Sequence, residues 1–501
     1  VKGLLPALID PTRAVDLTPL RDRRATAIAL WIQGEREYRH AKFTAALQLY
    51  ERALGDDSAL ALAAVKGAQA ASWVHDFPRG LKLVALALQH DSLLPRRYAV
   101  FARGLNGYFT GNADSAAHWL REVVALDRGW SEAAAALGEV YYHLLPSDAP
   151  LDSLARAAFT AAIIADSGFA PPLFHLLEAQ LRDGALPDAD RLIQRFREME
   201  PDPQLLLQIS LMRECVAAPA AMPWRERVQR NAVSVLLAGK ALTGGGHQFA
   251  CAEGAFRSIL SSPTTGRSER WGAFLGLQGI LVATGRDREA RVLVDSVAVR
   301  TGAARSLYVL ATAAGARMAE PAAALDSFAR QLYGERYERI PNAENLWVIG
   351  LWHHSQGNVA GLRVVDSTLR ARALGTGNPR DRYFATAVNA RVALSTDSAR
   401  AIELLRGLTG ALRGDVEWAI GEAVPADHLL LATLLLARGA HQDAIRAASV
   451  FDHAQPIMFL PYVPLSLAIR YRASMALGDE AAARRYRARL NGLHRGELLN
   501  N

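Results

Sequence analysis

Apolar residues between positions 46 and 196 mark one side of a helix, and this pattern returns at regular intervals. Each pattern begins with a small residue, and apolar residues follow four and seven positions later. The small residues are Ala46, Gly80, Ala116, Ala155 and Ala189, spaced 34, 36, 39 and 34 apart. Positions i, i+4 and i+7 share one helical side, so we expect amphipathic helices whose small residue lets a neighbour approach closely. Such regular spacing is typical of stacked repeats.

The remaining repeat positions agree with this reading. The residues four positions on are large and apolar: Tyr50, Val84, Leu120, Phe159 and Ile193. Gly34, Gly104 and Gly138 stand at one position of the preceding segments, so we expect a first helix that packs closely on the second. Asp, Ser and Pro at the exits, as in "DDS" (56–58) and "EPD" (200–202), stop one helix and cap the next.

Beyond residue 202 the pattern weakens, but its inter-helix turn persists. A glycine followed five residues later by an alanine occurs in both halves of the chain. The turn glycines are Gly111, Gly184, Gly285, Gly439 and Gly478. Further helical pairs are expected at about 271–299, 344–371, 382–408, 427–450 and 464–493. The sequence therefore predicts an all-α, right-handed superhelical solenoid of about ten or eleven helical hairpins.

Four segments follow from the Pro/Gly-rich interruptions. We expect an extended lead-in over 1–26, five repeats over 27–202, an irregular helical bend over 203–265 and degenerate repeats over 266–501. No interruption is long enough to serve as a free linker between separate domains.

The motifs "LGEVYY" (137–142) and "A-x3-F-x2-A" (155–162) resemble the tetratricopeptide repeat, a 34-residue helix-turn-helix unit. This resemblance covers residues 27 to about 202. Stretches such as "LWIQGEREYRHAKFTAALQLYERAL" and "PADHLLLATLLLARG" are also similar to the C-terminal repeat region of some bacterial serine/threonine kinases and transcriptional regulators. That similarity implies a part that senses or binds while another module acts.

Composition and charge narrow the class of protein. Half of the 501 residues are apolar and 21% are charged, as in folded soluble proteins. The net charge of +7 is weak evidence for nucleic acid, because phosphate binding needs basic groups gathered on one face. No window of 18 uncharged apolar residues predicts a transmembrane segment in this chain. Because it opens with Val1, we expect a processed chain or part of a longer one.

Two cysteines, Cys215 and Cys251, are too few for a disulfide framework or a four-cysteine zinc site. One disulfide outside the cytoplasm and two buried thiols both remain open. We find no kinase motif set, P-loop, HExxH or GxSxG, and no carboxylate pair singled out for acid/base chemistry. We therefore expect no enzyme, no cofactor and no metal.

A set of residues on the first helices is the candidate binding site. Placing Gly34, Gly104 and Gly138 in register turns these residues toward the concave groove of such a solenoid. This groove set comprises Trp31, Glu35, Tyr38, Trp73, Phe101, Tyr108, Glu139, Tyr142, His143, Phe174 and Glu178. Tyr and Trp could grip an extended or helical segment of a partner. Taken singly, each could instead pack between neighbouring helices.

We thus expect a non-catalytic scaffold or sensor that binds a protein or peptide within a larger bacterial assembly. The resemblance is compatible with an assembly at a membrane. The alternative is a helical-repeat protein that binds nucleic acid through its arginines, although nucleic acid is not the partner we expect. Both the cytoplasmic and the extracytoplasmic face of an inner membrane remain open as the location.

Overall fold

The structure is a computed structural model that describes residues 18–148, 150–301, 340, 342–409, 423–453 and 457–499. Throughout these residues every regular element is helical, with 23 α-helices and several short 3-10 helices. This confirms the expected all-α helical-repeat solenoid. Of the expected lead-in, residues 1–17 lie outside the described part of the chain, and Thr18–Leu20 form a 3-10 turn.

The chain divides into two compact units that are each discontinuous in sequence. Unit 1 consists of Val1–Val140, Ala157–Leu176 and Gln194–Pro203. Unit 2 consists of Tyr141–Arg156, Leu177–Ile193 and Gln204–Asn501.

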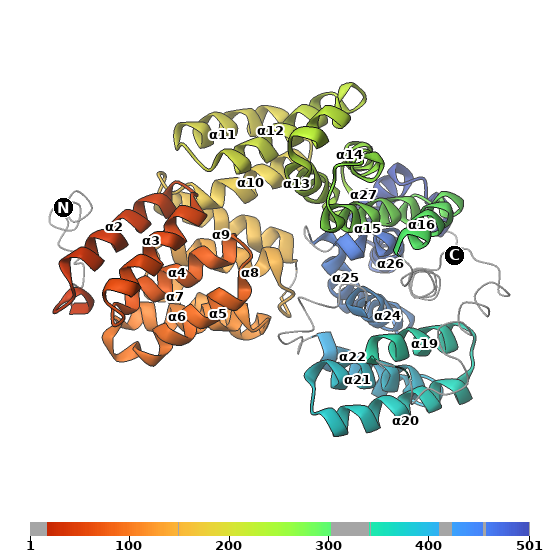
Figure 1. The fold of residues 1–501 in the computed structure, drawn as a ribbon. Coiled ribbons are helices and arrows are strands. Elements are labelled where there is room, and N and C mark those ends of the chain that lie inside the picture. The colour runs from red at the N-terminus through yellow and green to blue at the C-terminus, as the bar shows by residue number, and fades with distance from the viewer. Residues whose placement is uncertain are drawn as a thin grey trace. The chain divides into compact units, whose positions relative to one another are not determined.

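Successive helices of the first part form antiparallel pairs, as Figure 1 shows for those drawn in red and orange. The helices that lie wholly in unit 1 are α2 (Ala25–Arg39), α3 (Phe43–Asp56), α4 (Ala61–Trp73), α5 (Phe77–Gln89), α6 (Arg96–Phe109) and α7 (Ala113–Leu126). The next four helices contribute residues to both units: α8 (Ser131–His143), α9 (Leu151–Ala165), α10 (Pro171–Arg182) and α11 (Leu186–Glu198).

The predicted packing glycines stand where a side chain would collide with the paired helix. A Cβ on Gly34 would lie 2.6 Å from Tyr50 Cε1, and one on Gly138 would lie 2.5 Å from Phe159 Cε1. Gly104 meets Leu120 in the same way, at 2.7 Å from its Cγ. Real Cβ atoms essentially never approach so closely, so the first helix of each pair is as near as the second permits.

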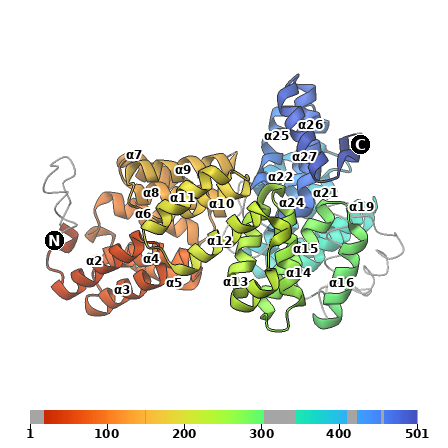
Figure 2. The same ribbon diagram turned by 90° about the horizontal axis from the view of Figure 1, so that it is seen from above.

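Unit 2 also consists of helical hairpins, and only the first residue of its first helix, Pro203, belongs to unit 1. Its helices are α12 (Pro203–Ala217), α13 (Trp224–Thr243), α14 (Phe249–Ser261), α15 (Arg267–Ala283), α16 (Asp287–Thr301), α19 (Ala343–Ser355), α20 (Val359–Thr376), α21 (Pro379–Ala393), α22 (Ser398–Thr409), α24 (Ala423–Ala437), α25 (His441–Ala448), α26 (Val463–Ala476) and α27 (Glu480–Gly492). Figure 2 shows α13, α14 and α15 side by side, in agreement with their contacts.

All five predicted turn glycines adopt the left-handed conformation. The backbone φ angles of Gly111, Gly184, Gly285, Gly439 and Gly478 lie between +64° and +78°. Glycine has no Cβ to oppose this conformation, which reverses the chain between two helices. The weak turn pattern of the second half therefore marked real hairpins.

The two cysteines form a disulfide that joins α12 to α14. Cys215 and Cys251 are 36 residues apart, with their Cα atoms separated by 5.7 Å. Between them, α13 is interrupted at Asn231, whose φ of −159° is not helical. Of the two alternatives that the sequence left open, the structure has the disulfide.

None of the helices in the described residues is both long enough and apolar enough to cross a membrane.

Candidate functional site

A largely buried ionic cluster joins helices α2, α3, α4 and α8 in unit 1. Lys66 of α4 is wholly buried, and its Nζ lies 2.7 Å from Glu132 Oε2 and 3.4 Å from Glu35 Oε2. Tyr50 donates a hydrogen bond of 2.8 Å from its hydroxyl to Glu35 Oε1. We call Glu35, Tyr50, Lys66 and Glu132 the inner cluster. Removing Lys66 would leave the two carboxylates without their shared cation.

The inner cluster is fixed by aromatic neighbours. The ammonium of Lys66 lies 4.6 Å from the centre of the Tyr38 ring, which is within range of a cation–π interaction. Trp130 donates a hydrogen bond of 3.1 Å from Nε1 to Glu132 Oε2. Lys66 of α4 thereby connects α2, through Glu35, with α8, through Glu132.

Burial has a marked effect on the acid–base properties of the inner cluster. Loss of water around Glu35 raises the pKa of this carboxyl to about 7, against the opposing effect of Lys66. Glu132 adds to the increase, since two carboxylates share one ammonium. Desolvation likewise raises the pKa of the Tyr38 and Tyr50 hydroxyls well above their ordinary value.

Next to this cluster, aromatic rings form a continuous stack in unit 1. Trp73 stacks on Phe43 with ring centroids 4.3 Å apart, and on His175 at 5.1 Å. His175 also stacks on Phe159 at 5.1 Å, and its Nε2 lies 3.2 Å from Glu139 Oε1. Imidazole and carboxylate are both groups that can ligate a metal ion.

Four members of the groove set line one small cavity in unit 1. Tyr38, Trp73, Tyr108 and Glu139 surround a space of about 10 Å³, together with Gln69 and Ser72. This is about the room that one water molecule needs, and the polar lining could bind it. The side chains of these helices therefore fill most of the space around this cavity.

The structure places the groove set in two classes of exposure. Seven members are buried: Tyr38, Phe101, Tyr108, Glu139, Tyr142, Phe174 and Glu178. Four are partly exposed: Trp31, Glu35, Trp73 and His143. In unit 2, Tyr142 donates a hydrogen bond of 2.7 Å to Glu178 Oε2, and Gln208 Nε2 donates one of 2.8 Å to Glu178 Oε1. The seven buried members of the groove set pack between helices.

Sequence reasoning missed Lys66, Glu132 and His175, although Lys66 contacts Glu35 and Glu132, and His175 stacks on Trp73. Lys66 offered a signal, because it is one of only five lysines in the chain and stands in the apolar stretch "ALALAAVKGAQAASW". A charged residue inside such a stretch needs a buried partner. His175 stands in a similar apolar stretch, "FAPPLFHLLEA" (169–179), whereas Glu132 ends the polar segment "DRGWSE" and carried no comparable signal.

Comparisons with known proteins give a likeness of structure only. No protein-family model and no curated protein sequence matches the chain. Similar solved structures include the TPR domain of P58(IPK), with 13% identity and a TM-score of 0.23 over 81% of this chain and 99% of that one. Another is Naa15/Naa10 bound to HypK-THB, with 13% identity and a TM-score of 0.24 over 93% of this chain and 68% of that one. At these TM-scores neither structure bears on what this chain binds.

Proposed function

We propose that this chain is a non-catalytic scaffold that binds another protein or a peptide. The observation that carries the proposal is the pair of partly exposed tryptophans, Trp31 and Trp73, on the first helices of unit 1. Trp31 packs on the apolar cluster of Ala27, Ala53 and Leu60, and Trp73 belongs to the stack with Phe43 and His175.

Tryptophan is enriched among the residues that dominate binding energy, because it buries a large area at little cost in rotamer freedom. Both side chains are held by well-packed neighbours, so a partner would lose little free energy in ordering them. Glu35 adds a partly exposed carboxyl that is fixed by Lys66 and Tyr50. A partner of this surface would present apolar side chains with a hydrogen-bond donor near Glu35.

The proposal extends to a role in a larger assembly. The resemblance of the sequence to repeat regions of bacterial kinases and regulators supports a sensing or assembling part, which a membrane-associated complex could contain. The arginines give less support to the nucleic-acid alternative. Many of them are already paired, as in Arg213 with Asp190 (2.9 Å) and Arg286 with Glu253 (2.7 Å).

Capture of the native protein from its source cells, with the co-purifying chains identified by mass, would supply the partner for a quantitative test. We expect Trp31→Ala and Trp73→Ala each to weaken binding of that partner at least about tenfold. The matched control is Trp271→Ala, which removes a 37% exposed tryptophan from α15 in unit 2. Circular dichroism should show the same helical content for all variants.

Equal affinities for wild type and both unit 1 variants would rule out this surface as the contact. If the co-purifying material is nucleic acid that is released as salt rises, the arginine-based alternative replaces the proposal.

A further inference from the structure

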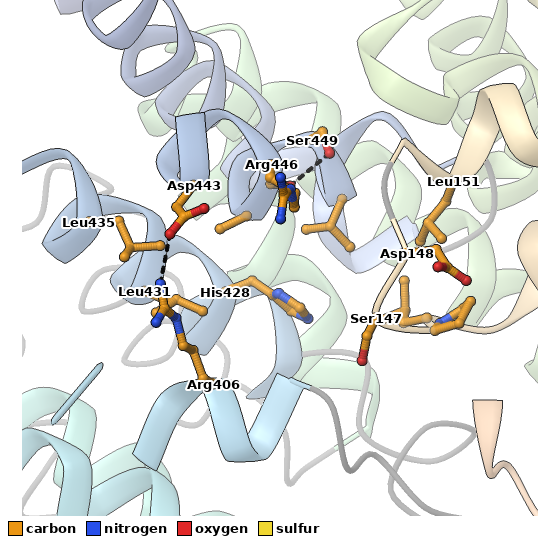
Figure 3. A pocket seen from close by; sticks show the side chains of 14 residues that line it. Ser147, Asp148, Leu151, Arg406, His428, Leu431, Leu435, Asp443, Arg446 and Ser449 are labelled. Atoms are coloured by element: carbon orange, nitrogen blue, oxygen red, sulfur yellow. Dashed lines mark hydrogen bonds and ion pairs between the residues drawn. The ribbon is translucent and has the colours of Figure 1, made fainter. Parts of the chain in front are cut away.

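Unit 2 contains a pocket of about 470 Å³, which is within the range of small-molecule sites. One wall consists of residues 145–148 and Leu151, and the others come from α22, α24 and α25. Figure 3 shows His428 extending from α24 toward the segment that carries Ser147 and Asp148. The apolar part of the lining is formed mainly by leucines, including Leu431 and Leu435.

The pocket walls are anchored by contacts outside the pocket. His453, which is 3% exposed, bonds through Nε2 to the carbonyl oxygen of Leu144 at 3.1 Å and so fixes the start of the facing segment. Asp452 follows the lining residue Val450 closely in the chain and forms ion pairs with Arg470 and Arg489. Burial alone would raise the pKa of Asp452, but the two arginines hold it well below its ordinary value. The pocket therefore exists before any ligand arrives.

His428 is buried, and one of its two ring nitrogens has no hydrogen-bond partner among the described residues. It is 6% exposed, and within the described part of the chain its Nε2 has no hydrogen-bond partner. Burial lowers the pKa of His428 to about 4, so the imidazole is neutral near pH 7 and can donate one hydrogen bond. Buried polar groups are nearly always hydrogen-bonded in folded proteins, and a ligand oxygen in the pocket would satisfy this one.

The two arginines of the lining differ in their pairing. Arg406 is bound to Asp443 at 2.8 Å, as the dashed line in Figure 3 shows. Arg446 is exposed at the pocket, and no ion pair involves it among the described residues. Its guanidinium can therefore bind a carboxylate with two parallel hydrogen bonds.

We propose that this pocket binds a small organic carboxylate with an apolar body. Arg446 holds the carboxylate, the Nε2–H of His428 donates to a ligand oxygen, and the leucines cover the apolar body. Asp148 lies on the facing segment, on the side of the pocket away from Asp443 in Figure 3, so the anionic end belongs near Arg446. This site is independent of the partner surface proposed for unit 1.

The test is isothermal titration of the full chain with hexanoate, octanoate, 3-phenylpropanoate and 4-phenylbutanoate, each beside the alcohol and the amine of the same skeleton. At least one carboxylate should bind with a Kd below about 1 mM, and its alcohol should bind at least about tenfold more weakly. Arg446→Gln should weaken binding about tenfold or more, and Arg438→Gln, an exposed arginine outside the pocket, should not.

Ala447→Trp fills the pocket from a lining position and should abolish binding, with the same thermal unfolding as wild type to show that the fold is intact. The proposal is overturned if none of the four carboxylates binds at 5 mM, about five times the upper Kd expected for a site of this kind. Equal binding by Arg446→Gln, or stronger binding of the amine than of the carboxylate, overturns it as well.

Discussion

At the scale of single residues, Lys66 shows what the repeat pattern conveys and what it omits. The repeat pattern identifies α4 as the first helix of its pair, and this predicts that α4 packs against α5. It does not say that Lys66 meets Glu35 from the preceding pair and Glu132 from a later one. These contacts depend on the rotation between successive helical pairs, and that rotation is set by side-chain packing along the whole stack.

Replacing Lys66 by Met should be strongly destabilising. The variant leaves Glu35 and Glu132 without their shared cation, so we expect a loss of about 3–5 kcal/mol in the free energy of unfolding, measured by urea denaturation. Lys82→Met, at an exposed position of α5, should change it by less than about 0.5 kcal/mol. Similar small effects from both substitutions would show that the ion pairs of Lys66 are not formed in solution.

The pKa of Glu35 predicts a pH dependence of stability. Folding raises this pKa from 4.5 to about 7, so unfolding within that window releases a proton, and stability falls as the pH rises through it. Glu35→Gln has no such proton. Relative to wild type, its free energy of unfolding should therefore rise by about 1–3 kcal/mol between pH 5 and pH 8. Parallel stability curves for the two proteins over this range would contradict the raised pKa.

At the scale of elements, the sequence predicted the hairpins well because packing and turns are local. Gly34 and Tyr50 belong to adjacent helices, and each turn glycine acts within a few residues. The pocket of unit 2 could not be predicted in this way. It brings the segment after α8 against α24 and α25, which follow it in the chain by nearly three hundred residues. The sequence likewise could not decide whether Cys215 and Cys251 are bonded, because that depends on how α12 and α14 pack.

Two glycine substitutions separate close packing from helix propensity. Gly34→Ala would place its Cβ against the Tyr50 ring and should lower the free energy of unfolding by about 1–3 kcal/mol. Gly55→Ala is the matched change, because Gly55 is exposed in α3 with no atom within 4 Å of a new Cβ. Its higher helix propensity should raise stability by up to about 1 kcal/mol. Chemical denaturation would test both, and a stabilising Gly34→Ala would mean that the helices of the first pair are farther apart.

At the scale of the whole molecule, the disulfide bears on both stability and environment. A bond between Cys215 and Cys251, 36 residues apart, restricts the unfolded chain and should contribute about 3–4 kcal/mol. We expect a lower thermal midpoint for Cys215→Ala/Cys251→Ala than for the oxidised wild type. Thiol titration of the denatured protein should find no free thiol before reduction and two after it. Two free thiols before reduction would instead favour a reducing compartment.

The division of the chain into units has a consequence for biosynthesis. Unit 1 includes Gln194–Pro203, which follows two stretches that belong to unit 2. Its contacts therefore cannot be completed until residue 203 has emerged from the ribosome, although the first hairpins are available much earlier. Until then the contacts of Tyr38 with Phe169 and of His40 with Met199 are absent, and the unfinished unit exposes apolar surface that a chaperone could bind.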